Sequence, residues 1–180
     1  MKGVIFTEFA NMIDEKFSPE LMEAILDDVD IPSGGAYTTV GDYDHGEILA
    51  LVSALSRRTE TDVPALVRAF GFYLFSKLGQ AHPEYIKDVP DAFAFLEKVH
   101  DHIHVEVKKL YPNAKVPDVL CERISDGEMV IKYSSDRPFA DVAEGLIAGC
   151  IEYFGAGAVL RRTAGAEDGT SAEFQLKRAA

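Results

Sequence analysis

Residues 131–137, Ile-Lys-Tyr-Ser-Ser-Asp-Arg, place three hydrogen-bond donors at alternating positions. In a β-strand the side chains of Tyr133, Ser135 and Arg137 share one face with Ile131, and the residues between them form the solvated face. Two hydroxyls and a planar guanidinium all donate hydrogen bonds, so their common ligand would be an acceptor-rich anion, a carboxylate or a phosphate. The alternative is a strand end at which Tyr133 and Arg137 face water.

A second cluster consists of His100, His102 and His104, which occupy every second position of the segment KVHDHIHVEV. On an α-helix with about 100° per residue, the apolar stripe centres near Ile103. His102 then points away, His100 lies nearer the centre and His104 at the margin. Both His100 and His104 stay open as ligands. They could also chelate zinc as a pair, which would need two further ligands, or be core-edge histidines.

The segments that must position these residues differ in hydrophobic period. Up to about residue 110 the apolar residues recur at helical spacing, and Ser18-Pro19 marks a helix start. Helices are predicted at about 4–13, from Pro19 onward, and at about 48–55, 63–75 and 91–110. After the segment YPNAKVP the period becomes two. Strands are predicted at 118–123, 128–135, 158–163 and 171–177, with a helix over PFADVAEGLIAGCIEYF. The fold class is α+β: helices, then an antiparallel sheet of about four strands with packed helices.

Composition limits the function further. A chain of 180 residues with 47% apolar content suits a single domain. The net charge of −12 repels phosphate backbones, which argues against a nucleic-acid partner. No apolar run is long enough for a membrane span, and Glu8 comes too early for a signal peptide, so we expect a cytoplasmic protein without a membrane partner. Cys121 and Cys150 are predicted to be free thiols packed as small hydrophobes.

The intervals between His104, Pro117 and the segment 133–137 are typical of a known family. The sequence resembles the haem-nitric oxide/oxygen binding (H-NOX) domain of bacterial gas sensors and of soluble guanylate cyclase. The family signature is His, twelve residues, Pro, about fifteen residues, then Tyr-x-Ser-x-Arg. His104, Pro117 and the segment 133–137 match it at these intervals. The resemblance also covers MKGVIFTEF, RAFGFYLF and the YP after the histidines, so it spans nearly the whole chain.

The resemblance implies one domain over residues 1–180, with a distal helical part at about 1–60 and a proximal helix and sheet at about 61–180. It implies haem b as the cofactor, lying between the two parts. His104 matches the proximal iron ligand, and Tyr133, Ser135 and Arg137 match the residues that hold the haem propionates. Pro117 resembles the family proline that presses on the porphyrin and keeps it bent.

The resemblance also bears on ligand choice. Oxygen-binding members carry a distal tyrosine five residues after the motif arginine, where this chain has Val142, and a supporting polar residue where it has Leu74. Phe9 occupies the position of an aromatic donor, and Ile5 is expected beside it against the haem. The pocket is therefore expected to bind NO and CO and to exclude O₂, although Tyr43 and Tyr73 could still reach in.

The resulting hypothesis is a haem-based NO sensor that catalyses no reaction. Binding of NO is expected to break the bond between iron and His104 and to let the haem flatten. Because the chain ends soon after the last strand, we expect the output on a separate protein. By resemblance this partner would be a histidine kinase of a two-component system, or a diguanylate cyclase or phosphodiesterase of cyclic-di-GMP signalling. The alternatives are an O₂-binding or redox-sensing haem protein and a zinc-dependent enzyme on His100 and His104.

Overall fold

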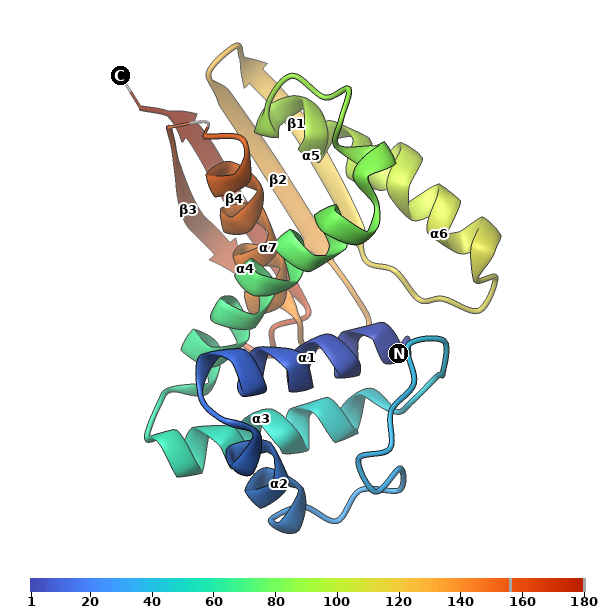
Figure 1. Cartoon of the computed structure of the whole chain (residues 1–180). Helices are drawn as coiled ribbons and strands as arrows, with labels where there is room; N and C mark the ends of the chain where they lie inside the picture. The colour runs from blue at the N-terminus through green and yellow to red at the C-terminus, as the bar shows by residue number, and fades with distance from the viewer. Residues whose placement is uncertain (156, 180) are drawn as a thin grey trace. The chain divides into compact units, whose positions relative to one another are not determined.

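The computed structural model describes residues 1–155 and 157–179, and Figure 1 traces the chain. The chain divides into two compact units, Met1–Phe70 and Gly71–Ala180. The first is helical, and the second contains a four-stranded antiparallel sheet with packed helices. The predicted α+β class is confirmed. Within the described residues, no helix is both long and apolar enough to cross a membrane.

Three helices and the start of a fourth build the first unit. They are α1 (Gly3–Lys16), α2 (Pro19–Asp27), α3 (His45–Thr59) and α4 (Val63–Ala81), which continues into the second unit. Ser18 caps α2 by accepting a hydrogen bond from the Leu21 N–H at 3.3 Å, with Pro19 at the first helical position, as the sequence predicts. The buried side chains of this unit include Phe6, Phe9, Ile13, Ile25, Leu51 and Leu55.

The long loop between α2 and α3 is held by a buried carboxylate. Glu47, in the first turn of α3, is only 6% exposed. It accepts hydrogen bonds from the Ser33 hydroxyl and, at 2.9 Å, from the Tyr37 hydroxyl. The same loop binds the start of α1, because the Gly3 N–H donates to the Gly41 carbonyl at 2.8 Å. The loop therefore fixes the N-terminal end of α1.

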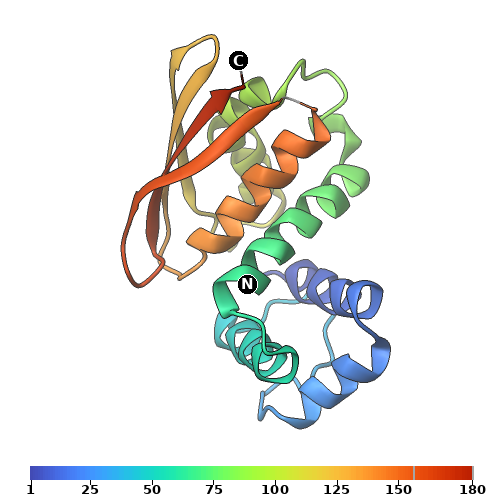
Figure 2. The same cartoon turned by 90° about the vertical axis from the view of Figure 1, so that its left-hand side faces the viewer.

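The sheet of the second unit has the strand order β1-β2-β4-β3. Its strands are β1 (Asp118–Ser125), β2 (Glu128–Ser134), β3 (Ala158–Gly165) and β4 (Ser171–Arg178). Ile131 pairs with Phe174 and Tyr133 with Ala172, and all four side chains are buried. Figure 2 shows the helices of this unit on one face of the sheet. The inward face of β2 is thus the one predicted from its alternating pattern.

Close backbone packing joins α4 to α7 (Ala140–Tyr153). A Cβ atom added at Gly71 would lie 2.3 Å from the Val142 carbonyl oxygen, and one added at Gly149 would lie 2.9 Å from the Phe72 carbonyl oxygen. No side chain fits at either distance. Glycine at both positions lets the two helix backbones touch.

Both cysteines are free, as predicted. The Cys121 thiol donates to the Leu96 carbonyl at 3.4 Å, and the buried Cys150 thiol donates to the Ala92 carbonyl at 3.9 Å. Burial raises the pKa of Cys121 to about 12 and raises that of Cys150 further. The two thiols pack against the helix that precedes the histidines.

The segment predicted as one long helix over 91–110 is helical from Ala92 to Leu110, but it is not α-helical throughout. A short 3₁₀ turn, η1 (Pro83–Tyr85), leads to three successive segments: α5 (Ala92–Lys98), a π-helical turn η2 (Val99–Ile103), and α6 (His104–Leu110). The backbone N–H of His104 donates to the carbonyl of Val99, five residues back. A π turn accommodates one more residue than an α turn, so the assumption of about 100° per residue fails beyond Val99.

Candidate haem site

His104 begins α6, directly after the π turn. Its Nδ1 atom is shielded from solvent and completes no hydrogen bond with any described residue. Burial lowers the pKa of the imidazole to about 4, while the nearby Pro117 carbonyl acts to raise it. The side chain is therefore a neutral imidazole at physiological pH. This is the form that binds a metal ion.

The other two histidines of the cluster lie in the π turn. His102 is exposed, as the sequence predicts, and its ring lies edge-on to Tyr85 with centroids 6.2 Å apart. His100 has a shielded Nδ1 without a hydrogen bond among the described residues, and this atom lies 3.9 Å from an Asp118 carboxylate oxygen. His102 is therefore exposed, whereas His100 and His104 are partly buried. His100 and His104 share an inward-facing nitrogen.

The segment that follows β2 carries the three predicted donors. Tyr133 is 5% exposed and the Arg137 side chain 16%. Burial raises the pKa of the Tyr133 hydroxyl, against the opposing effects of the Ser135 hydroxyl and of Arg137. The Ser135 hydroxyl accepts the Arg137 backbone N–H at 3.2 Å, which turns the chain after the strand. The three side chains thus neighbour one another, and Tyr133 and Arg137 are shielded as an anion site requires.

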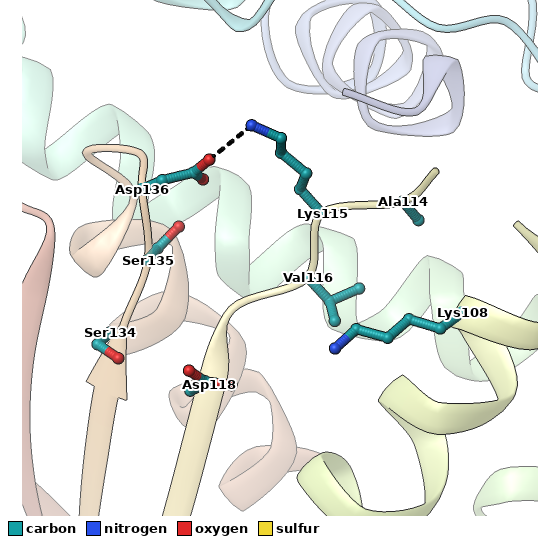
Figure 3. A pocket seen from close by; sticks show the side chains of 8 residues that line it. All are labelled: Lys108, Ala114, Lys115, Val116, Asp118, Ser134, Ser135 and Asp136. Atoms are coloured by element: carbon teal, nitrogen blue, oxygen red, sulfur yellow. Dashed lines mark hydrogen bonds and ion pairs between the residues drawn. The ribbon is translucent and has the colours of Figure 1, made fainter. Parts of the chain in front are cut away.

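An ion pair that the sequence analysis missed links this segment to the loop before β1. Lys115 Nζ lies 2.9 Å from Asp136 Oδ2, and Asp136 also lies 3.8 Å from Arg137 Nε. Figure 3 shows the Lys115 side chain directed toward Asp136. The two residues border an open pocket of about 480 Å³. This pocket is lined by Lys108, Ala114, Lys115, Val116, Asp118, Ser134, Ser135 and Asp136. Two opposite charges 21 residues apart form no sequence pattern from which the ion pair could be predicted.

The residues expected on the distal side divide between the units. Leu74 and Val142 belong to the second unit, where Val142 contributes its carbonyl to the contact with Gly71. Ile5 and Phe9 belong to α1 of the first unit, in which Phe9 is buried with its ring edge-on to Phe70. All four side chains are apolar.

The two tyrosines that could supply a distal donor have different surroundings. The Tyr43 hydroxyl accepts the Thr38 backbone N–H at 2.8 Å inside the first unit. The Tyr73 side chain is buried, and Lys77 Nζ lies 4.9 Å from the centre of its ring. The hydroxyl of Tyr43 is thus already engaged by the loop between α2 and α3.

A zinc site on the histidine pair would need more ligands. Among residues 1–155 and 157–179, no group of three or more His, Cys, Asp and Glu side chains is arranged to hold a metal ion. His100 and His104 thus lack the ligand set that a protein-bound zinc requires.

Comparison with known proteins identifies the family. The model of the family described as haem-NO-binding matches residues 2–161. The chain belongs to this family, the H-NOX proteins. A comparison with curated protein sequences found no match.

Solved H-NOX structures agree over the full length of the chain. The Fe(II) unliganded H-NOX protein from K. algicida is 30% identical, with a TM-score of 0.93, and the match covers 100% of this chain and 97% of that one. The H-NOX from Shewanella woodyi in the Fe(II)CO state, bound to IWP-051, is 41% identical, with a TM-score of 0.84 and coverage of 99% and 95%. An S. oneidensis H-NOX in the Fe(II)NO state, 23% identical with a TM-score of 0.89, shares the fold.

Haem is the cofactor of the H-NOX family, whose members are gas sensors. The residues of the second unit fit this group. His104 offers a neutral imidazole for the iron. Tyr133, Ser135 and Arg137 offer neighbouring donors that suit carboxylates.

Proposed function

We propose that this H-NOX chain senses NO: that it binds NO and CO at ferrous haem b held by His104, excludes O₂, and signals to a separate protein. The observation that carries the proposal is the shielded, neutral imidazole of His104 in the same unit as the donors Tyr133, Ser135 and Arg137. This pair of features suits a cofactor that has both a metal ion and carboxylates.

His104 would bind iron through Nε2. Its Nδ1 is the shielded nitrogen, and the Pro117 carbonyl is an acceptor near the imidazole. A proton on Nδ1 leaves the Nε2 lone pair free for the metal. Pro117 would in addition contact the porphyrin and keep it bent, a role that rests on the family resemblance.

Tyr133, Ser135 and Arg137 would hold the propionates. The guanidinium gives a charge-assisted, bidentate hydrogen bond, and the hydroxyls add directed donors. Asp136 competes for Arg137, while its bond to Lys115 limits this competition. The segment can thus hold negative charge in spite of the net charge of −12.

Selectivity would follow from the apolar residues Leu74 and Val142. When bound, haem would supply a ferrous iron that can bind a diatomic gas, and His104 would be the protein ligand that NO binding releases. Bound O₂ carries partial negative charge and needs a hydrogen-bond donor, which neither side chain can provide. Ile5 and Phe9 are proposed as further apolar haem contacts on the strength of the resemblance alone.

The signal would be the release of His104. After the release of His104, Pro117 would no longer keep the porphyrin bent, and the change of shape would alter the surface that a partner binds. A partner responds only if it binds the two states with different affinity. We propose a histidine kinase or an enzyme of cyclic-di-GMP turnover as this partner, and no reaction catalysed by the chain itself.

The test is the absorption spectrum of the reduced, haem-loaded protein under NO, under CO and in air. We expect complexes with NO and CO, an NO complex in which iron has lost His104, and no stable O₂ complex. A stable spectrum of an O₂ complex in air would overturn the selectivity and favour an oxygen-binding protein. Absence of a haem spectrum would overturn the proposal altogether.

A further inference from the structure

Lys108 lies on the helix that carries the proposed iron ligand. It follows His104 by four residues in α6, so the two side chains leave the same face of the helix, about 6 Å apart along its axis. Burial is the main cause of the lowered pKa of His104, and the positive charge of Lys108 lowers this pKa further. The ammonium group is therefore close enough to the imidazole for its charge to act there.

The same side chain faces the segment that is proposed to hold the propionates. Lys108 and Ser135 line one open pocket of about 480 Å³, together with the loop that contains Val116. Figure 3 shows the Lys108 side chain extending from α6 toward this loop. Lys108 therefore faces the same space as one of the donors proposed for the propionates.

The charge of Lys108 is available for a ligand. In the part of the chain that the structure describes, Lys108 forms no ion pair and no hydrogen bond through its side chain. The next lysine of the helix, Lys109, is paired with Glu106 at 2.7 Å. Lys115, which also lines the pocket, is paired with Asp136 at 2.9 Å. An unpaired ammonium group that lines a pocket suits a carboxylate ligand.

Asp118 is the other carboxylate of the pocket and the one that could compete for Lys108. Its Oδ1 atom lies instead 3.9 Å from Nδ1 of His100, and within the described residues it forms no ion pair with Lys108. The pocket therefore offers one available cation beside the hydroxyl of Ser135.

We propose that Lys108 is a further haem-binding residue, which forms an ion pair with a propionate from the helix that carries His104. The inference rests on the proposed function and adds a cation that the Tyr-x-Ser-x-Arg segment does not supply. Together with Arg137, it would provide one cation for each propionate in a chain whose net charge is −12. Because Lys108 is exposed, salt would screen the ion pair.

Lys108→Met tests the proposal, because it removes the charge and keeps most of the length of the side chain. At low salt, haem should transfer to an apoprotein acceptor about two- to fivefold faster than from wild type, as expected for an exposed ion pair. At about 1 M salt this difference should disappear. Lys108→Arg should keep the wild-type rate. Lys109→Met is the matched control, because this lysine is already paired on the same helix, and it should transfer haem like wild type.

Haem whose propionates are methyl esters separates an ion pair from a change in the fold. The ester groups carry no charge, so wild type and Lys108→Met should lose this haem at equal rates. A faster loss from Lys108→Met that persists with the esterified haem or at high salt overturns the ion pair, as does an unchanged rate with natural haem. Both results leave the proposed sensor intact, because the spectra under NO and CO report on His104. A ferrous spectrum without His104 as a ligand would overturn the proposed function and this inference with it.

Discussion

Lys115 and Asp136 form an ion pair of 2.9 Å between the loop that contains Pro117 and the segment that contains Ser135 and Arg137. The pair thus joins the two parts of the second unit that are proposed to hold the iron ligand and the propionates. Both side chains are more than half exposed, so the pair itself adds little to stability. Its effect should appear in haem binding instead.

Lys115→Met and Asp136→Asn should change haem retention in opposite directions. Without Lys115, the Asp136 carboxylate is free to attract Arg137 away from the propionates, so haem should transfer faster to an apoprotein acceptor. Without the Asp136 charge, Arg137 is fully available, and transfer should be unchanged or slower. Equally faster haem transfer in both variants would show that the ion pair acts only by joining the two segments, and that competition for Arg137 plays no part.

His104→Gly should abolish axial ligation by the protein. The ferrous spectrum should change, and added imidazole should restore it by filling the space left by the ring. His100→Ala and His102→Ala are the matched controls and should keep a normal ferrous spectrum, because their rings are not proposed to reach the iron. Loss of haem from His100→Ala but not from His104→Gly would reassign the ligand.

Arg137→Ala should weaken haem binding more than Ser135→Ala. A shielded hydrogen bond to a charged group contributes about 1.5–3 kcal/mol, against about 1 kcal/mol for a neutral one. The expected loss of affinity is roughly 10- to 150-fold for Arg137→Ala and about fivefold for Ser135→Ala. Haem titration of the apoprotein measures both. Affinities indistinguishable from wild type in both variants would mean that the segment is only a strand end.

Tyr37→Phe should destabilise the first unit. The change removes one of the two hydroxyl donors to the buried Glu47 carboxylate and leaves the ring stacked on Phe6 at 4.5 Å. An unsatisfied buried acceptor costs about 1–3 kcal/mol of unfolding free energy. Urea denaturation measures it, with Tyr43→Phe as the control in an exposed hydrogen bond. Equal losses of unfolding free energy in both variants would show that the hydrogen bond to the buried Glu47 contributes no more than an exposed one.

Asp91→Ala should destabilise the protein in a pH-dependent way. Asp91 caps α5 by accepting the Ala94 N–H at 2.9 Å, and it accepts a second bond from Arg178 at 2.5 Å. The cap, more than Arg178, lowers the pKa of Asp91. A carboxyl group whose pKa is lowered by folding stabilises the fold at pH values above its ordinary pKa. This stabilisation is lost as the pH falls through the pKa of the folded state. The loss of about 1 kcal/mol expected at neutral pH should therefore shrink below about pH 4.

The alternating pattern of 131–137 was sufficient to predict which face of β2 is buried, because strand side chains alternate whatever the partner strand is. The strand ends at Ser134, one residue before the predicted end. Helical spacing was less informative around the histidines. A π turn is a local departure from the average period, and nothing in the segment VHDHI distinguishes it from an α-helical sequence.

The two polar contacts around Glu47 and Lys115 also escaped prediction. Each joins residues from different elements, and their proximity depends on how loops close in three dimensions. Glu47 reads as an ordinary acidic residue in the first turn of a helix, where the helix dipole favours it. Only the folded loop shows that its carboxylate is buried under Ser33 and Tyr37.

The state of the two cysteines has a chemical consequence for the proposed sensing of NO. Thiols react with oxidants and nitrosating species as thiolates. The raised pKa values of Cys121 and Cys150 keep both sulfurs protonated, and each already donates to a carbonyl of α5. The chain thus offers reactive nitrogen species no ready sulfur nucleophile at these positions. The proposed response to NO would therefore take place at the haem and would not be shared by these two thiols.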